Sequence, residues 1–130
     1  IFKRKIFLYN FTLFALSIPA TYLMIKLTGK VEYADHFLWY ILIIIATSFL
    51  NMSMPYHYVL YSKKKDISII CINAVALILF IITSFAGVEL LPDSGMLAIL
   101  IGLIGSNLFI LMAKYNIFIK EFSGEGRHLN

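Results

Sequence analysis

The sequence predicts an all-α, polytopic membrane protein with four transmembrane helices. Of its 130 residues, 61% are hydrophobic and only 14% are charged, and the mean hydropathy is +0.87. A water-soluble domain of this length usually has about a quarter of its residues charged. A soluble core cannot hide this much apolar surface, so the lipid bilayer is the expected solvent.

Four long apolar segments carry most of this hydrophobic content. A bilayer core about 30 Å thick is crossed by roughly 20 apolar residues in a helix, and backbone amides in lipid must pair within their own segment. The segments of this length are residues 6–27, 37–54, 67–87 and 96–118. They predict one domain over residues 1–122, built as two tandem helical hairpins, followed by a cytoplasmic tail over residues 123–130.

The cations predict the orientation of these helices. One group of them precedes the first segment, fills the loop after the second, or lies at or beyond the end of the fourth. This group is Lys3, Arg4, Lys5, Lys63, Lys64, Lys65, Lys114, Lys120 and Arg127. Only Lys26 and Lys30 belong to the opposite side, where Glu32 and Asp35 offset them. The positive-inside rule predicts that both termini and the middle loop are cytoplasmic, with the protein in the cytoplasmic (inner) membrane.

One short phrase occurs twice in the chain. Residues 57–63, HYVLYSK, align with residues 114–120, KYNIFIK, and each copy closes a helix that runs toward the cytoplasm. The likeness indicates either a repeated hairpin or the general preference of such helix ends for aromatic residues followed by lysine. The predicted anchors at the membrane interface are Tyr58, Tyr61, Tyr115 and Phe118.

Small residues recur every four positions in the last segment, at Ala98, Gly102 and Ser106. This spacing lets helix backbones approach each other closely in lipid. The seam therefore predicts packing either within the chain's own four helices, which we favour, or against a second copy or a partner subunit.

Asparagines inside the spans need hydrogen-bond partners, because lipid offers none. Asn51, Asn73 and Asn107 are such residues. They are expected to face the interior of the bundle. There they serve either as interhelical hydrogen bonds or as a polar path for a lipid headgroup.

The sequence lacks the patterns of an enzyme active site. No acidic residue lies inside the four segments, and His36, His57 and His128 are on different segments without metal-ligand spacing. No glycine-rich phosphate loop is present. We therefore predict no catalytic residue, no metal and no cofactor. The basic charge at the membrane surface indicates contact with anionic lipids rather than with nucleic acid.

Three stretches resemble the GtrA-like family of four-span membrane proteins. They are SFLNMSMPYHYVLYSKKK (48–65), GVELL (87–91) and SNLFILMAKYNIFIK (106–120). A second resemblance is to the C-terminal part of polysaccharide flippases of the multidrug/oligosaccharidyl-lipid/polysaccharide superfamily. It rests on GKVEYADHFLWYIL (29–42) and YVLYSKKKD (58–66), and it gains weight if residue 1, an isoleucine, is a cut end of a longer protein.

Both resemblances imply a small integral membrane protein that assists translocation of polyprenyl-phosphate-linked sugars in cell-envelope polysaccharide synthesis. In this hypothesis Asn51, Asn73 and Asn107 offer the polar path. The residues expected to bind the lipid phosphate are Lys63, Lys114, Lys120 and His57. The alternative is a non-catalytic adaptor or anchor subunit of a larger complex, for example with a membrane glycosyltransferase. A homo-oligomer and a membrane-defence protein are further alternatives.

Overall fold

The computed structural model consists of four long helices, and none of its described residues is in a strand. It describes the backbone of residues 2–29 and 36–125, and the side chains of these residues except 2, 3, 6 and 123–125. The helices are α1 (Phe2–Thr28), α3 (Phe37–Ser62), α4 (Asp66–Leu90) and α5 (Gly95–Glu125), with a short 3-10 turn, η1 (Pro92–Ser94), before α5. All four helices are long and apolar enough to cross a membrane. The predicted all-α membrane fold is confirmed.

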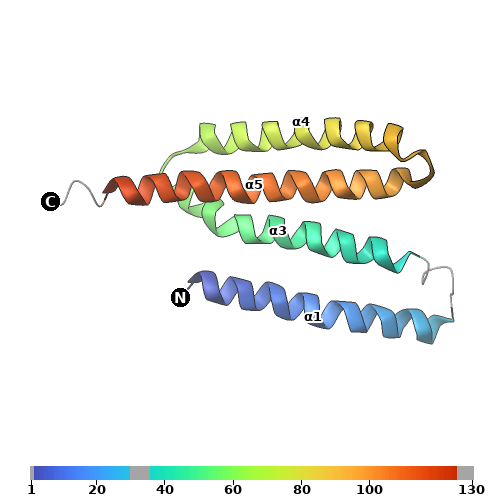
Figure 1. Ribbon diagram of the computed structural model, residues 1–130. Coiled ribbons are helices and arrows are strands. Elements are labelled where there is room, and N and C mark those ends of the chain that lie inside the picture. The colour runs from blue at the N-terminus through green and yellow to red at the C-terminus, as the bar shows by residue number, and fades with distance from the viewer. Residues whose placement is uncertain (1, 30–35, 126–130) are drawn as a thin grey trace.

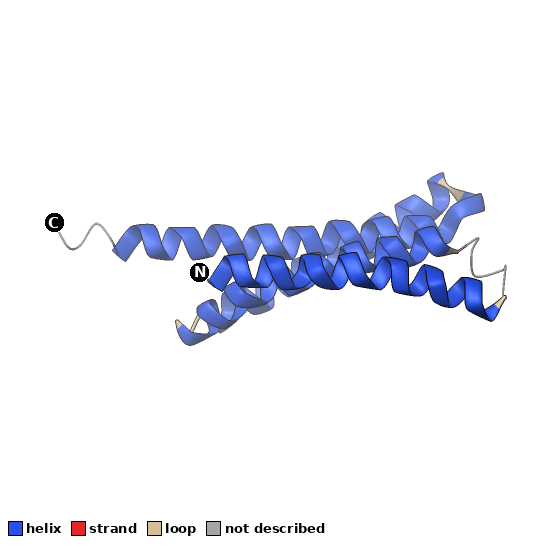
Figure 2. Cartoon of the chain, turned by 90° about the horizontal axis from the view of Figure 1, so that it is seen from below, coloured by secondary structure: helices blue, strands red, loops and turns tan. Residues whose placement is uncertain are grey.

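The helices form two consecutive hairpins, α1 with α3 and α4 with α5 (Figure 1). The start of α1, the α3–α4 turn and the end of α5 all lie at one end of the molecule, which we call the basic end (Figures 1 and 2). Helices α3 and α5 therefore run in the same direction. Helix α5 lies between α4 and α3, and it packs closely on both.

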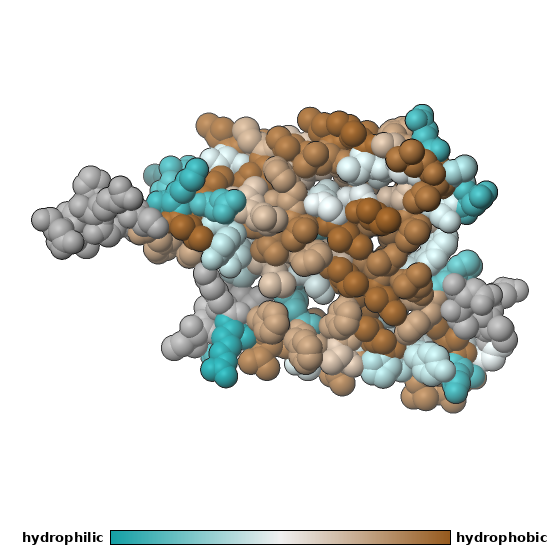
Figure 3. Space-filling model, in the orientation of Figure 1, coloured by the Kyte–Doolittle hydropathy of each residue, from teal (hydrophilic) through white to brown (hydrophobic). Residues whose placement is uncertain are grey.

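The molecular surface has the distribution expected of a membrane protein. Apolar residues cover the middle of the face shown in Figure 3, and hydrophilic residues gather toward the two ends. Large apolar side chains are exposed on all four helices, including Leu16, Leu38, Phe85 and Met112. In water such a surface would aggregate, whereas in lipid it is the solvated surface.

The helices are longer than the predicted spans, mainly at the basic end. Helix α3 continues from residue 54 to Ser62, and α5 continues from residue 118 to Glu125. The first three residues of the predicted tail 123–130 are thus helical, and residues 126–130 lie outside the described residues. The extra turns carry aromatic and charged side chains, which suit the headgroup region while the backbone stays helical.

Small residues set the close packing of α4 on α5. Ala98, Gly102 and Ser106, the predicted seam, are buried. A Cβ atom added at Gly102 would lie 2.8 Å from Ser84 Oγ, and one added at Gly87 would lie 2.7 Å from Ala98 Cβ. The seam therefore faces α4 of the same chain, as in the packing alternative that we favoured.

Helix α1 is the least integrated helix. It contacts α3 alone among the described elements. The two helices are joined near their connecting loop, where Thr21 Oγ1 lies 2.8 Å from the Tyr40 hydroxyl and the Tyr22 ring meets Phe37 edge-on. Toward the basic end the two helices leave grooves between them.

Candidate functional site

The basic end is built around a tight turn of three lysines. Helix α3 ends at Ser62 and α4 begins at Asp66, so only Lys63, Lys64 and Lys65 connect them. Lys64 adopts a left-handed conformation with a φ of 56°, and the Lys65 amide donates to the Leu60 carbonyl at 3.0 Å. This closure resembles a Schellman motif with lysine in the place that glycine usually takes.

Helix α5 contacts this turn through two side chains. The Lys65 ammonium forms an ion pair with Glu121 at 3.0 Å, and Lys63 Nζ lies 5.5 Å from the centre of the Phe122 ring. Lys63 and Lys120 are exposed. Two of the four residues expected to bind the lipid phosphate are therefore at the surface of the basic end.

The other two, Lys114 and His57, lie between α3 and α5. Lys114 is only 3% exposed, and its Nζ lies 3.4 Å from His57 Nδ1. The two nitrogens are within hydrogen-bonding distance, and the protonation of the pair decides which of them donates. The pair therefore lies within the helix packing, and a role for it in phosphate binding stays a prediction.

The two copies of the repeated phrase lie side by side. His57 and Lys114 occupy the same position in the alignment, and they touch each other across the parallel helices α3 and α5. A contact between equivalent positions is what a twofold axis between two copies produces. The arrangement is compatible with a duplicated hairpin, although α1 and α4 pack differently on their partners.

The predicted aromatic anchors fall into two groups. Tyr58 and Tyr61 are 68% and 64% exposed, as expected of residues in contact with lipid headgroups. Tyr115 and Phe118 instead meet the ring of Tyr56 edge-on, with centroids 5.4 and 5.3 Å apart. These two side chains therefore help to join α5 to α3.

The three asparagines expected to form a polar path do not share one cavity. Asn107 is buried and donates from Nδ2 to the Ala46 carbonyl of α3 at 2.9 Å, so it acts as an interhelical hydrogen bond. Asn73 is exposed on α4, and Asn51 faces the space between α3 and α1. None of the described grooves is lined by more than one of the three.

Further polar residues join Asn51 in lining the gap between α1 and α3. Two adjoining cavities of about 360 Å³ and 260 Å³ share Asn10, Leu13 and Asn51, and we call them together the polar groove. Its polar side chains are Tyr9, Asn10, Ser17, Thr47, Ser48, Asn51 and Tyr58. Helical spacing could have indicated part of this set, because Asn10 and Ser17 are seven residues apart and Ser48 and Asn51 are three apart.

The described residues offer no obvious metal site. Within residues 2–29 and 36–125, no group of three or more His, Cys, Asp or Glu side chains is placed to hold an ion. The chemistry available in the grooves is hydrogen bonding and apolar contact.

The fold defines the chain as a multi-pass, α-helical membrane protein. Comparison with models of protein families, with curated proteins and with solved structures finds no match for this chain.

Proposed function

We propose that the protein assists the translocation of polyprenyl-phosphate-linked sugars across the cytoplasmic membrane, with both termini and the lysine turn on the cytoplasmic side. The proposal assigns it no catalytic step. A sugar headgroup needs a polar surface inside the bilayer, and an isoprenoid chain needs a lateral opening to lipid. Both requirements are met by a groove that has hydrogen-bonding side chains and opens between two loosely joined helices.

The polar groove is the observation that carries this proposal. It lies inside the candidate spans of α1 and α3, where each unpaired polar group has a free-energy cost. Asn51 is exposed in this groove and offers both an amide donor and a carbonyl acceptor. The hydroxyl groups of sugars match such side chains.

The surface lysines supply the second part of the proposal. Lys63 and Lys120 lie at the basic end, toward which the polar groove opens near Tyr58. A lysine ammonium at the headgroup level attracts a lipid phosphate. In this mechanism the phosphate stays near the lysines while the sugar enters the polar groove.

Transport into proteoliposomes tests the proposal. Asn51→Leu is expected to lower the rate at which a labelled polyprenyl-phosphate sugar becomes protected by about 5- to 10-fold, the loss expected from one hydrogen bond. Asn73→Leu is the matched control, because Asn73 is also an exposed asparagine, on α4 and outside the polar groove. Equal transport by both variants and the parent protein would contradict the proposal.

A second candidate, a non-catalytic adaptor subunit, is favoured by the exposure of α1. This helix contacts α3 alone, and Ala15 and Ala20 are exposed on it. Tryptophan at either position is tolerated in lipid but not in a helix interface. If the protein is an adaptor, Ala15→Trp or Ala20→Trp should release a co-purified membrane glycosyltransferase without changing the unfolding of this chain. Retention of that partner by both variants would contradict the adaptor role.

A further inference from the structure

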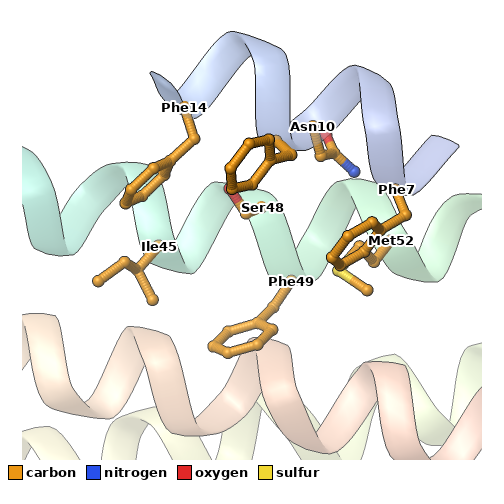
Figure 4. Close-up of a pocket in the computed structure, with 8 residues that line it drawn as sticks. Phe7, Asn10, Phe14, Ile45, Ser48, Phe49 and Met52 are labelled. Carbon is orange, nitrogen blue, oxygen red and sulfur yellow. The ribbon is translucent and has the colours of Figure 1, made fainter. Parts of the chain in front are cut away.

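A second groove lies on the other side of the contact between α1 and α3, and aromatic side chains dominate it. A cavity of about 180 Å³ is lined from α1 by Phe7, Asn10, Phe11 and Phe14 and from α3 by Ile45, Ser48, Phe49 and Met52 (Figure 4). We call it the aromatic groove. Its surface is almost entirely apolar, and it opens sideways into the space that lipid would fill.

Asn10 is the anomalous residue of this groove. It is only 7% exposed, and its Nδ2 is buried without a hydrogen-bond partner. Figure 4 shows the amide near Phe7 and Met52. The Ser48 hydroxyl lines the same groove but donates to the Ile44 carbonyl, and it makes no hydrogen bond with Asn10 Nδ2. A buried donor without a partner destabilises a protein, so such a group indicates that an acceptor is supplied from elsewhere.

A cation precedes the aromatic groove on the same face of α1, toward the basic end. Arg4, Phe7, Phe11 and Phe14 are spaced by three or four residues, so they share one face of the helix. Arg4 is exposed near the basic end. The six residues from Arg4 to Asn10 rise by about 9 Å along the helix. This order of a cation, a buried amide donor and an apolar groove matches the order of groups along a phospholipid.

We propose that the aromatic groove binds one acyl chain of an anionic diacyl phospholipid. The lipid phosphate pairs with Arg4, one ester carbonyl accepts a hydrogen bond from Asn10 Nδ2, and the acyl chain lies against Phe7, Phe11 and Phe14. A polyprenyl phosphate fits this order less well, because hydrocarbon alone follows its phosphate. A protein helix also fits less well, because helices pack in lipid through small residues and this groove is lined by large ones.

Binding requires a small rearrangement of the groove. Asn10 Nδ2 is covered by its neighbours when the groove is empty, so a carbonyl oxygen reaches it only after a side chain moves. Met52 is suited to this movement, because methionine is unbranched and has three rotatable bonds. The Phe7 side chain lies at the same end of the groove and is 59% exposed.

A comparison of ester- and ether-linked lipids tests the carbonyl contact. Dioleoyl phosphatidylglycerol and its diether analogue are titrated into the full chain, and the bound fraction is measured by native mass spectrometry. The diether lacks carbonyl oxygens, so it is expected to bind about 5- to 10-fold more weakly than the diester, the loss expected from one hydrogen bond. In Asn10→Leu the two lipids should bind equally, because neither then has a donor to meet. Asn51→Leu, in the polar groove, should keep the preference of the parent protein.

Two further measurements keep the proposal falsifiable if Asn10→Leu does not fold. Arg4→Gln, a substitution at an exposed position, should weaken the binding of phosphatidylglycerol more than the binding of phosphatidylcholine. Met52→Phe should weaken the binding of both lipids, because the larger side chain fills the groove. The proposal is overturned if the parent protein does not distinguish diester from diether lipid, or if a polyprenyl phosphate displaces phosphatidylglycerol and depends on Asn10. It does not depend on the proposed transport, because lipid binding is measured without a sugar.

Discussion

His57→Leu is expected to lower the free energy of unfolding by about 1–3 kcal/mol, the cost of leaving a buried polar group without its hydrogen-bond partner. The substitution removes the Nδ1 atom that lies 3.4 Å from Lys114 Nζ. Lys114 is 3% exposed, so water cannot replace the lost partner without opening the contact between α3 and α5. Unfolding by SDS in mixed micelles, followed by far-UV circular dichroism, measures the change.

Replacing Lys114 should not lower the free energy of unfolding as His57→Leu does. Lys114→Met replaces a buried cation by an apolar side chain of similar length, and such replacements are often neutral or stabilising. The double variant His57→Leu/Lys114→Met should therefore recover most of the stability that His57→Leu loses. If His57→Leu alone leaves unfolding unchanged, or if the double variant is as unstable as His57→Leu, then the histidine is not the partner that buried Lys114 requires.

The fold could be predicted from the sequence because a long hydrophobic segment indicates directly that the surrounding solvent is lipid. Segment 67–87, for example, corresponds to helix Asp66–Leu90. The ends of helices were less predictable, because hydropathy detects the lipid and not the helix. The predicted span ends at Met54, because the residues that follow, Pro55, Tyr56 and His57, are less apolar. Helix α3 nevertheless continues to Ser62.

The sites were less predictable, because a sequence shows which residues need partners but not which partners they find. Asn107 and Asn10 are both asparagines in apolar runs. Asn107 meets the Ala46 carbonyl, whereas Asn10 Nδ2 meets no acceptor. This difference arises from how each helix is rotated about its axis and where it crosses its neighbour. The repeated phrase was the one sequence feature that indicated such a contact. It aligned His57 with Lys114, and these residues are in contact.

Gly87→Ala is expected to lower the free energy of unfolding by about 1–3 kcal/mol, the usual cost of overpacking a close contact. The added Cβ would lie 2.7 Å from Ala98 Cβ and 3.4 Å from Ala98 Cα. An alanine Cβ has no rotamer by which to move aside, so α4 and α5 must separate. This separation would also loosen the packing of Gly102 against Thr83 and Ser84.

The matched control and the rescue both come from the same helix pair. Gly105 is exposed on α5, and nothing lies within 4 Å of an added Cβ there. Gly105→Ala should therefore leave stability unchanged or raise it by up to about 1 kcal/mol through helix propensity. The exchange variant Gly87→Ala/Ala98→Gly moves the methyl group from one helix to the other, so it should regain most of the stability lost by Gly87→Ala. A tolerated Gly87→Ala, or an exchange variant less stable than either single change, would show that α4 and α5 do not meet through this contact.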